Sequence, residues 1–96
     1  MSKFLVLWSL DTSKLGTDAV KSVLSMPKYA DNLKKSGKLE KRYHLVGQHG
    51  GAWIYDVDTN EELDRLLAQA PIYNFANFTL YPLAEMPEAG TAESDS

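Results

Sequence analysis

Ninety-six residues with a hydrophobic content of 44% predict one globular domain. The chain has no cysteine, which excludes disulfide and thiolate chemistry and makes the cytoplasm the default location. Residues 84–96 hold four of the 13 acidic residues and no basic one, so the remainder has 9 acidic against 10 basic side chains. A body this close to neutral argues against a nucleic-acid partner, and no apolar run approaches the roughly 18 residues of a membrane span.

The first half of the chain predicts a strand and a long helical region. Residues 3–10 are apolar on both faces, which indicates a strand covered on both sides. A polar loop follows over residues 11–16, and residues 17–36 show helical spacing. Gly37 is typical of the end of a helix. Pro27 predicts either a kink or a break, with Ser25 capping a second piece.

Two further strands are predicted at 38–46 and 52–57, joined by a glycine-rich corner. Strict alternation along the first of them places Glu40, Arg42 and His44 on one face. Tyr43 falls on the opposite face, where we expect it to pack on a helix.

The second half of the chain completes an α+β pattern. Thr59 and Glu62 form a capping box before a helix with an apolar stripe, and Pro71 ends that helix. A strand is expected over 75–82. The acidic segment 84–96 predicts a flexible tail after a domain of residues 1–83.

The order β-α-β-β-α-β is that of a ferredoxin-like protomer, with helices on one face of an antiparallel sheet. The other face carries aromatic residues. We expect it to be covered by a second copy in a homodimer or a larger homo-oligomer.

Several short segments between Gly37 and Pro87 resemble muconolactone delta-isomerase and its relatives. They are the alternating aromatic and polar residues of 37–47, the strand end Tyr55-Asp56-Val57 and the turn Pro71-Ile72-Tyr73. The resemblance implies a dimeric α+β barrel, with a larger ring-like assembly as a further option. It also implies a cofactor-free isomerisation of a small unsaturated lactone during the degradation of aromatic compounds.

Three polar positions depart from the pattern of that family. His44 stands where the family has arginine, Gln48 where it has histidine after the glycine, and Met86 where it has histidine before the C-terminal proline. Because polar positions decide which substrate is accepted, these departures bear on the identity of the lactone.

His44 is the predicted proton shuttle, because moving a double bond beside a carbonyl requires a proton to be taken from one carbon and returned to another. Glu40 would orient the ring of His44, and Arg42 would hold a substrate carboxylate. The alternative is that His44 is a solvated strand residue.

His49, Trp53, Tyr55 and Tyr81 are the other predicted substrate-binding residues. His49 would lie over the mouth of a pocket, or else be an exposed turn residue. The three aromatic residues would form walls for a flat ring if they share the open face of the sheet, or else belong to the core or the dimer interface.

No cofactor or metal is predicted, because two histidines without a matching carboxylate spacing are a weak metal signal. Two alternatives to the lactone isomerase stay open. One is a cyclase or isomerase acting on a polyketide-like substrate, and the other is a non-catalytic module for ligand binding or assembly.

Overall fold

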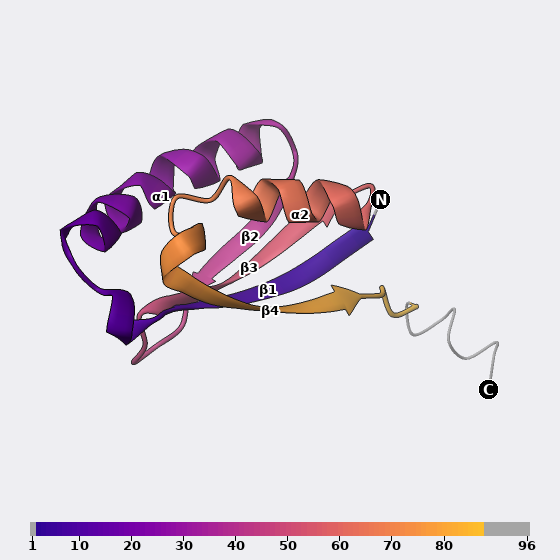
Figure 1. Ribbon diagram of the computed structural model, residues 1–96. Helices are drawn as coiled ribbons and strands as arrows, with labels where there is room; N and C mark the ends of the chain where they lie inside the picture. Colours follow the sequence, from indigo (N-terminus) through magenta and orange to yellow (C-terminus); the bar gives the residue numbers. More distant parts are fainter. Residues whose placement is uncertain (1, 88–96) are drawn as a thin grey trace.

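The computed structural model describes residues 2–87. Within them the strands are β1 (Ser2–Leu10), β2 (Leu39–His44), β3 (Gly50–Val57) and β4 (Ala76–Leu83). The α-helices are α1 (Thr17–Lys35) and α2 (Asn60–Ala68), and two short 3-10 helices cover Thr12–Lys14 and Tyr73–Phe75 (Figure 1). The predicted order β-α-β-β-α-β is confirmed.

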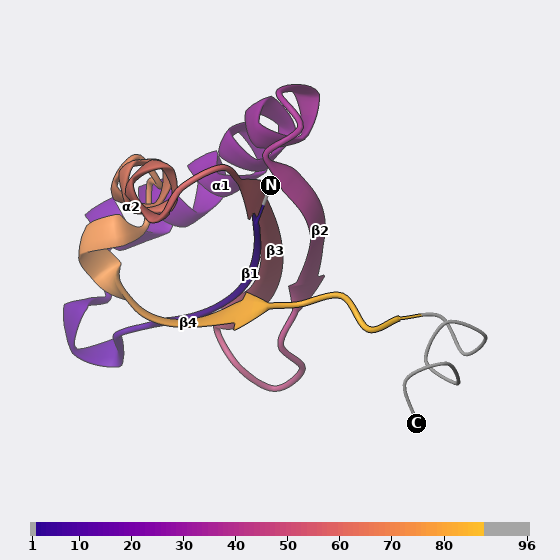
Figure 2. The ribbon, with the colours of Figure 1, turned by 90° about the vertical axis from the view of Figure 1, so that its right-hand side faces the viewer.

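The four strands form one sheet in the order β2-β3-β1-β4, and every neighbouring pair is antiparallel. Both helices lie on the same side of this curved sheet, as Figure 2 shows. The predicted α+β, ferredoxin-like fold class is therefore confirmed. The sheet has one covered face and one open face.

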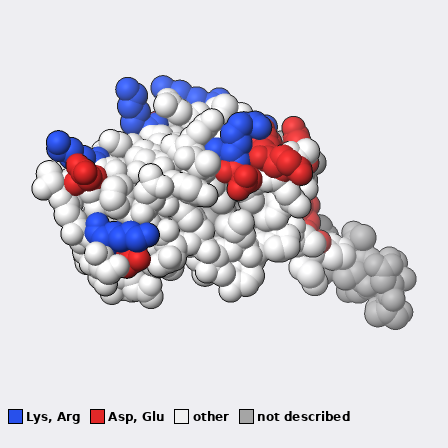
Figure 3. All heavy atoms as spheres, in the orientation of Figure 1, with Lys and Arg blue, Asp and Glu red and all other residues white. Residues whose placement is uncertain are grey.

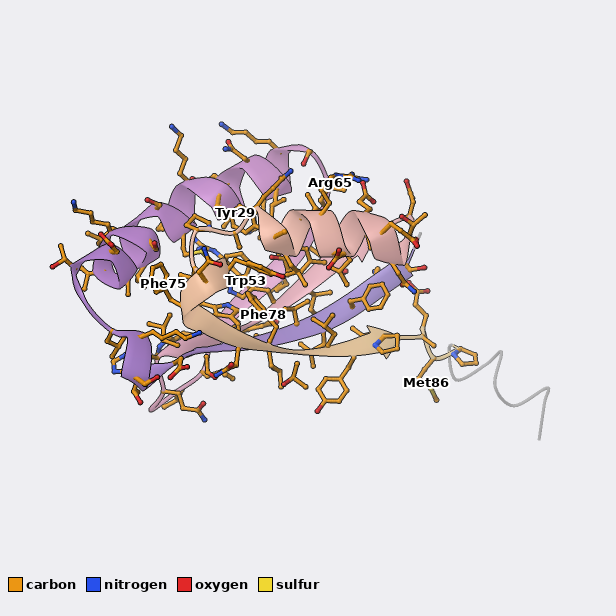
Figure 4. All side chains as sticks on the ribbon, in the orientation of Figure 1. Tyr29, Trp53, Arg65, Phe75, Phe78 and Met86 are labelled. Atoms are coloured by element: carbon orange, nitrogen blue, oxygen red, sulfur yellow. The ribbon has the colours of Figure 1, made fainter. Side chains whose placement is uncertain are left out.

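The core lies between the helices and the covered face (Figure 4). The sheet contributes alternate residues of β1 and β3, because successive side chains of a strand point to opposite faces. Helix α1 contributes residues at helical spacing, and α2 contributes its leucine stripe. The main buried members are Val6, Trp53, Tyr55, Val57, Met26, Ala30, Leu33, Leu63 and Leu67.

Helix α1 continues through Pro27, so the predicted break with Ser25 as a cap is wrong. The Ser25 hydroxyl instead donates to the Lys21 carbonyl oxygen at 3.1 Å within the helix. Burial of Met26 and Ala30 on either side of the proline favours a continuous helix. Gly37 ends the helix as predicted, with a φ of +76° and a bond from the Lys38 N–H to the Leu33 carbonyl oxygen.

The β2–β3 hairpin differs most from the prediction. The register shifts between Leu39 and Lys41, so that Leu39 pairs with Tyr55 while Lys41 already pairs with Ile54. This β-bulge breaks the alternation on which the predicted faces rested. Leu39 is buried on the helix side, whereas Tyr43 is 54% exposed, so the prediction that Tyr43 packs on a helix is wrong.

The open face of the sheet carries apolar and aromatic side chains on all four strands, which we call the apolar band, with Lys3, Lys41 and Asp56 on the same face. The band runs across β1, β2, β3 and β4 at the positions that alternate with the buried ones. Its members include Leu5, Leu7, Tyr43, Ile54, Tyr81 and Leu83.

Charged side chains of both signs lie over the two helices. Figure 3 shows basic side chains over α1 and acidic ones around the start of α2. No helix within residues 2–87 is both long enough and apolar enough to cross a membrane. Residues 84–87 are irregular and exposed, and residues 88–96 of the predicted tail lie outside the described residues.

The predicted capping box of α2 is present. The Thr59 hydroxyl accepts from the Glu62 N–H at 3.0 Å, and the Glu62 carboxylate accepts from the Asp58 N–H at 2.9 Å. This last bond, followed by a bond from Lys38, lowers the pKa of Glu62. The box therefore ties the start of α2 both to the preceding loop and to the chain just before β2.

We expect Thr59→Ala to lower the free energy of unfolding by about 1 kcal/mol, because the Glu62 N–H loses its acceptor. Urea unfolding followed by circular dichroism measures the change. Thr59→Ser keeps the hydroxyl and should stay close to wild type. Equal midpoints for the alanine and wild-type proteins would contradict the capping role.

Candidate active site

A cavity of about 300 Å³ opens between α1 and the β2–β3 edge of the sheet. Helix α1 provides an apolar wall, and the sheet provides two tryptophans together with an arginine and a histidine. Apolar walls with a few converging polar groups are typical of small-molecule sites. The lining residues are Trp8, Val23, Met26, Pro27, Arg42, Tyr43, His44, Gly50, Gly51 and Trp53.

Arg42 and His44 reach this cavity from β2. Arg42 pairs with Trp53 across the hairpin, and His44 pairs with Gly51. The Arg42 guanidinium lies 5.7 Å from the centroid of the Trp53 ring, which holds its charge over the aromatic floor. Within residues 2–87, Arg42 takes part in no salt bridge. The side chains of Arg42 and His44 are both exposed to solvent. They are therefore free to meet an anionic ligand.

Glu40 does not join them, and the predicted sharing of a face by Glu40, Arg42 and His44 is wrong. Glu40 forms a salt bridge with Lys3 at 3.1 Å and lines a separate hollow on the open face with Ile54. This contact with Glu40 raises the pKa of Lys3. The bulge between Leu39 and Lys41 is the reason, because it turns Glu40 away from the face that carries His44.

Trp53 and Tyr55 lie on the covered face, not on the open one. They are 3% and 2% exposed, and Trp53 stacks between Tyr29 and Tyr55 with ring centroids 6.1 and 6.3 Å apart. Figure 4 shows Tyr29 and Trp53 in the layer between the helices and the sheet. Trp53 lines the cavity, whereas Tyr55 supports Trp53 from behind.

Hydroxyl groups fix this stack to both helices. The Tyr29 hydroxyl donates to the Leu66 carbonyl oxygen of α2 at 2.6 Å and lies 3.0 Å from the Tyr55 hydroxyl. Burial raises the pKa of Tyr29 and, more strongly, that of Tyr55. The floor of the cavity is thus held by a neutral, hydrogen-bonded pair of phenols.

The structure separates His49 and Tyr81 from this cavity. His49 lines a second apolar hollow beside Leu10, Val20 and Leu24, at the other end of α1 from Gly37. Tyr81 lies opposite Leu5 on the open face and is 49% exposed. Of the predicted site residues, the structure therefore brings together His44, Arg42 and Trp53.

Within residues 2–87 no cluster of three His, Cys, Asp or Glu side chains could hold a metal ion.

Comparison with known proteins matches residues 7–89 to a family described as Muconolactone delta-isomerase. The chain belongs to the muconolactone delta-isomerase family. The Muconolactone Delta-isomerase of Acinetobacter baylyi is 30% identical over 74 residues, which cover 76% of this chain and 77% of that protein. The Muconolactone Delta-isomerase of Cupriavidus pinatubonensis is 33% identical over 61 residues, so the match spans 66% of its length.

A crystal structure of muconolactone isomerase has the same fold. It superposes with a TM-score of 0.78 at 19% identity, over 91% of this chain and 93% of that one. The predicted resemblance to the muconolactone delta-isomerase family is therefore confirmed in both sequence and fold.

Sequence reasoning missed Trp8 and the α1 wall in this member of the muconolactone delta-isomerase family. Trp8 was expected only as one of several apolar residues of the first strand, yet it pairs with Gly51 and lines the cavity. The pattern of β1 places Trp8 on the covered face. Only the β1–β3 register brings it beside Trp53, and the sequence carries no signal for that register.

We expect Tyr29 and Tyr55 to ionise at higher pH in the folded than in the unfolded protein. Burial raises the pKa of both phenols in the folded protein. The free energy of unfolding is therefore at its full value below the unfolded-state pKa of about 10, and it falls as pH rises above that value because only the unfolded chain then loses its phenol protons. In a phenolate absorbance titration, part of the signal should appear only with alkaline unfolding, and Tyr55→Phe should shrink this late part. Superimposable curves for native and urea-unfolded protein would show the phenols to be freely ionisable.

Proposed function

We propose that this protein is an enzyme that moves a carbon–carbon double bond within a small unsaturated lactone by proton transfer, without a cofactor. The setting would be the breakdown of aromatic compounds. Membership of the muconolactone delta-isomerase family supports the proposal. The observation that carries it is the convergence of His44 and Arg42 on one tryptophan-lined cavity.

The chemistry requires one base that also acts as an acid. Muconolactone is an unsaturated lactone whose ring carbon next to the ring oxygen bears a carboxymethyl arm. His44 would remove the proton from that carbon, which leaves a dienolate with its charge on the lactone carbonyl oxygen. The imidazolium would then return a proton to the carbon beside the carbonyl. Imidazole suits both steps because it can accept and donate a proton under the same conditions.

Arg42 would orient the substrate for this exchange. Its guanidinium can donate two parallel hydrogen bonds to the carboxylate of the carboxymethyl arm. The cation–π contact with Trp53 keeps the guanidinium over the cavity floor. The position of Arg42 two residues before His44 would then hold the reacting ring carbons near the imidazole.

We expect His44→Gln to lower the turnover of muconolactone by at least about 100-fold, the usual loss when a general acid–base is removed. Proton NMR of muconolactone in deuterated water follows both the enol-lactone product and deuterium uptake beside the carbonyl. His49→Gln is the matched control, because this histidine lines the other hollow, and it should retain activity.

Full turnover by the His44→Gln protein would remove His44 from the role of base. Binding of the lactone by folded wild-type protein without exchange or product would favour the non-catalytic binding module.

The proposal extends to a homodimer formed through the open face of the sheet. This face presents Leu5, Ile54 and Tyr81 in one apolar band, and a single sheet of this size leaves such a band in water unless a partner covers it. A second copy fits because an identical face would be equally apolar. The ring-like assembly implied by the resemblance would require further contacts.

We expect Ile54→Lys to weaken self-association by at least about tenfold, because it would bury a charge at the centre of the band. Light scattering across a concentration series measures the change. Leu24→Lys, at a side chain 74% exposed on α1, is the matched control and should leave the association unchanged. A monomeric wild-type protein would contradict the proposed dimer.

A further inference from the structure

We propose that the indole N–H groups of Trp8 and Trp53 bind the lactone carbonyl oxygen of the substrate and stabilise the negative charge that develops on it. This inference rests on the proposed lactone isomerisation. We call these two residues the indole pair.

The two indole nitrogens converge on one place beside Gly51. A Cβ atom at position 51 would lie 2.7 Å from Trp8 Nε1 and 2.8 Å from Trp53 Nε1. The two rings meet edge to face, with centroids 6.2 Å apart and planes at 81°. Glycine at this position therefore allows both hydrogen-bond donors to pack against the backbone of β3, where the Cβ of any other residue would clash with them.

The indole N–H of Trp8 is a buried hydrogen-bond donor without an acceptor within residues 2–87. A buried donor without an acceptor is unfavourable, and such a group in a folded protein calls for an explanation. Trp8 lines the cavity that His44 and Arg42 reach, so an oxygen atom of a ligand bound there would supply the missing acceptor.

The placement of the neighbouring groups favours the carbonyl oxygen over the carboxylate. Arg42 and His44 lie two residues apart on β2, a rise of about 7 Å, which is comparable to the length of a lactone with a carboxymethyl arm. Arg42 carries a charge and suits the carboxylate. Gly51, and with it the indole pair, faces His44, where the reacting end of the ring would lie.

The indole N–H groups are neutral hydrogen-bond donors, and they suit the negative charge that the lactone carbonyl oxygen carries only during the reaction. Proton removal by His44 forms a dienolate, and its negative charge moves onto the carbonyl oxygen until the proton returns to the ring. Donors fixed in advance beside that oxygen bind the dienolate more strongly than the neutral lactone. The rings of Tyr29 and Tyr55 hold Trp53 in place by stacking on it. The indole pair would therefore act as an oxyanion hole.

The chain contains two tryptophans, both in the indole pair, so their indole N–H signals report on this place alone. The experiment records ¹H–¹⁵N spectra of the wild-type protein during titration with the saturated analogue of muconolactone, which has the carbonyl and the carboxylate but cannot isomerise. Acetate is the control ligand, because it offers only a carboxylate. Trp8→Phe assigns the two signals and keeps an apolar ring.

The expected result is a downfield shift of the Trp8 indole proton with the saturated lactone and not with acetate. In kinetics, Trp8→Phe should lower the turnover number of muconolactone by about 100-fold, the usual loss for one oxyanion donor, with a smaller change in KM. The spectrum of the variant shows whether it is folded, and the wild-type titration does not depend on it.

An unmoved Trp8 signal in a protein that isomerises muconolactone would overturn the indole pair's role and leave the proposed function standing. A shifted Trp8 signal without any isomerisation would support the oxygen site and overturn the proposed reaction. A folded protein that neither binds the saturated lactone nor turns over muconolactone would overturn both.

Discussion

The stack of Tyr29, Trp53 and Tyr55 is the contact on which the rest of the structure depends. It joins α1 to β3, and the bond from the Tyr29 hydroxyl to the Leu66 carbonyl oxygen extends it to α2. Large rings held by hydrogen bonds set the distance between the helices and the sheet more firmly than aliphatic packing alone. That distance leaves the cavity open at the β2–β3 edge.

The two faces of the sheet carry different side chains. The covered face carries the aromatic floor and, through Arg42 and His44, the polar groups of the candidate site. The open face carries an apolar band that suits a second copy. A single β-bulge contributes to this division, because it keeps Glu40 with Lys3 on the open face while Arg42 stays over Trp53.

The sequence predicts the fold well because its signals are local. The capping box at Thr59 and the glycine at 37 act within one turn of a helix, and both are present. The site is harder to predict because it depends on register. Neither the bulge that moves Glu40 nor the pairing that brings Trp8 to Gly51 has a local signature. Pro27 shows a third case, in which tertiary packing overrides a local break signal.

The candidate site lies on the covered face of the sheet, between α1 and the β2–β3 edge. A crystal structure of the protein with the saturated lactone would show whether the ligand binds on this face. We expect the ligand in the cavity between α1 and the β2–β3 edge, with its carboxylate on Arg42 and its ring beside His44. A lactone bound instead against Tyr81 and Ile54 on the open face, or between two copies there, would contradict this location of the site.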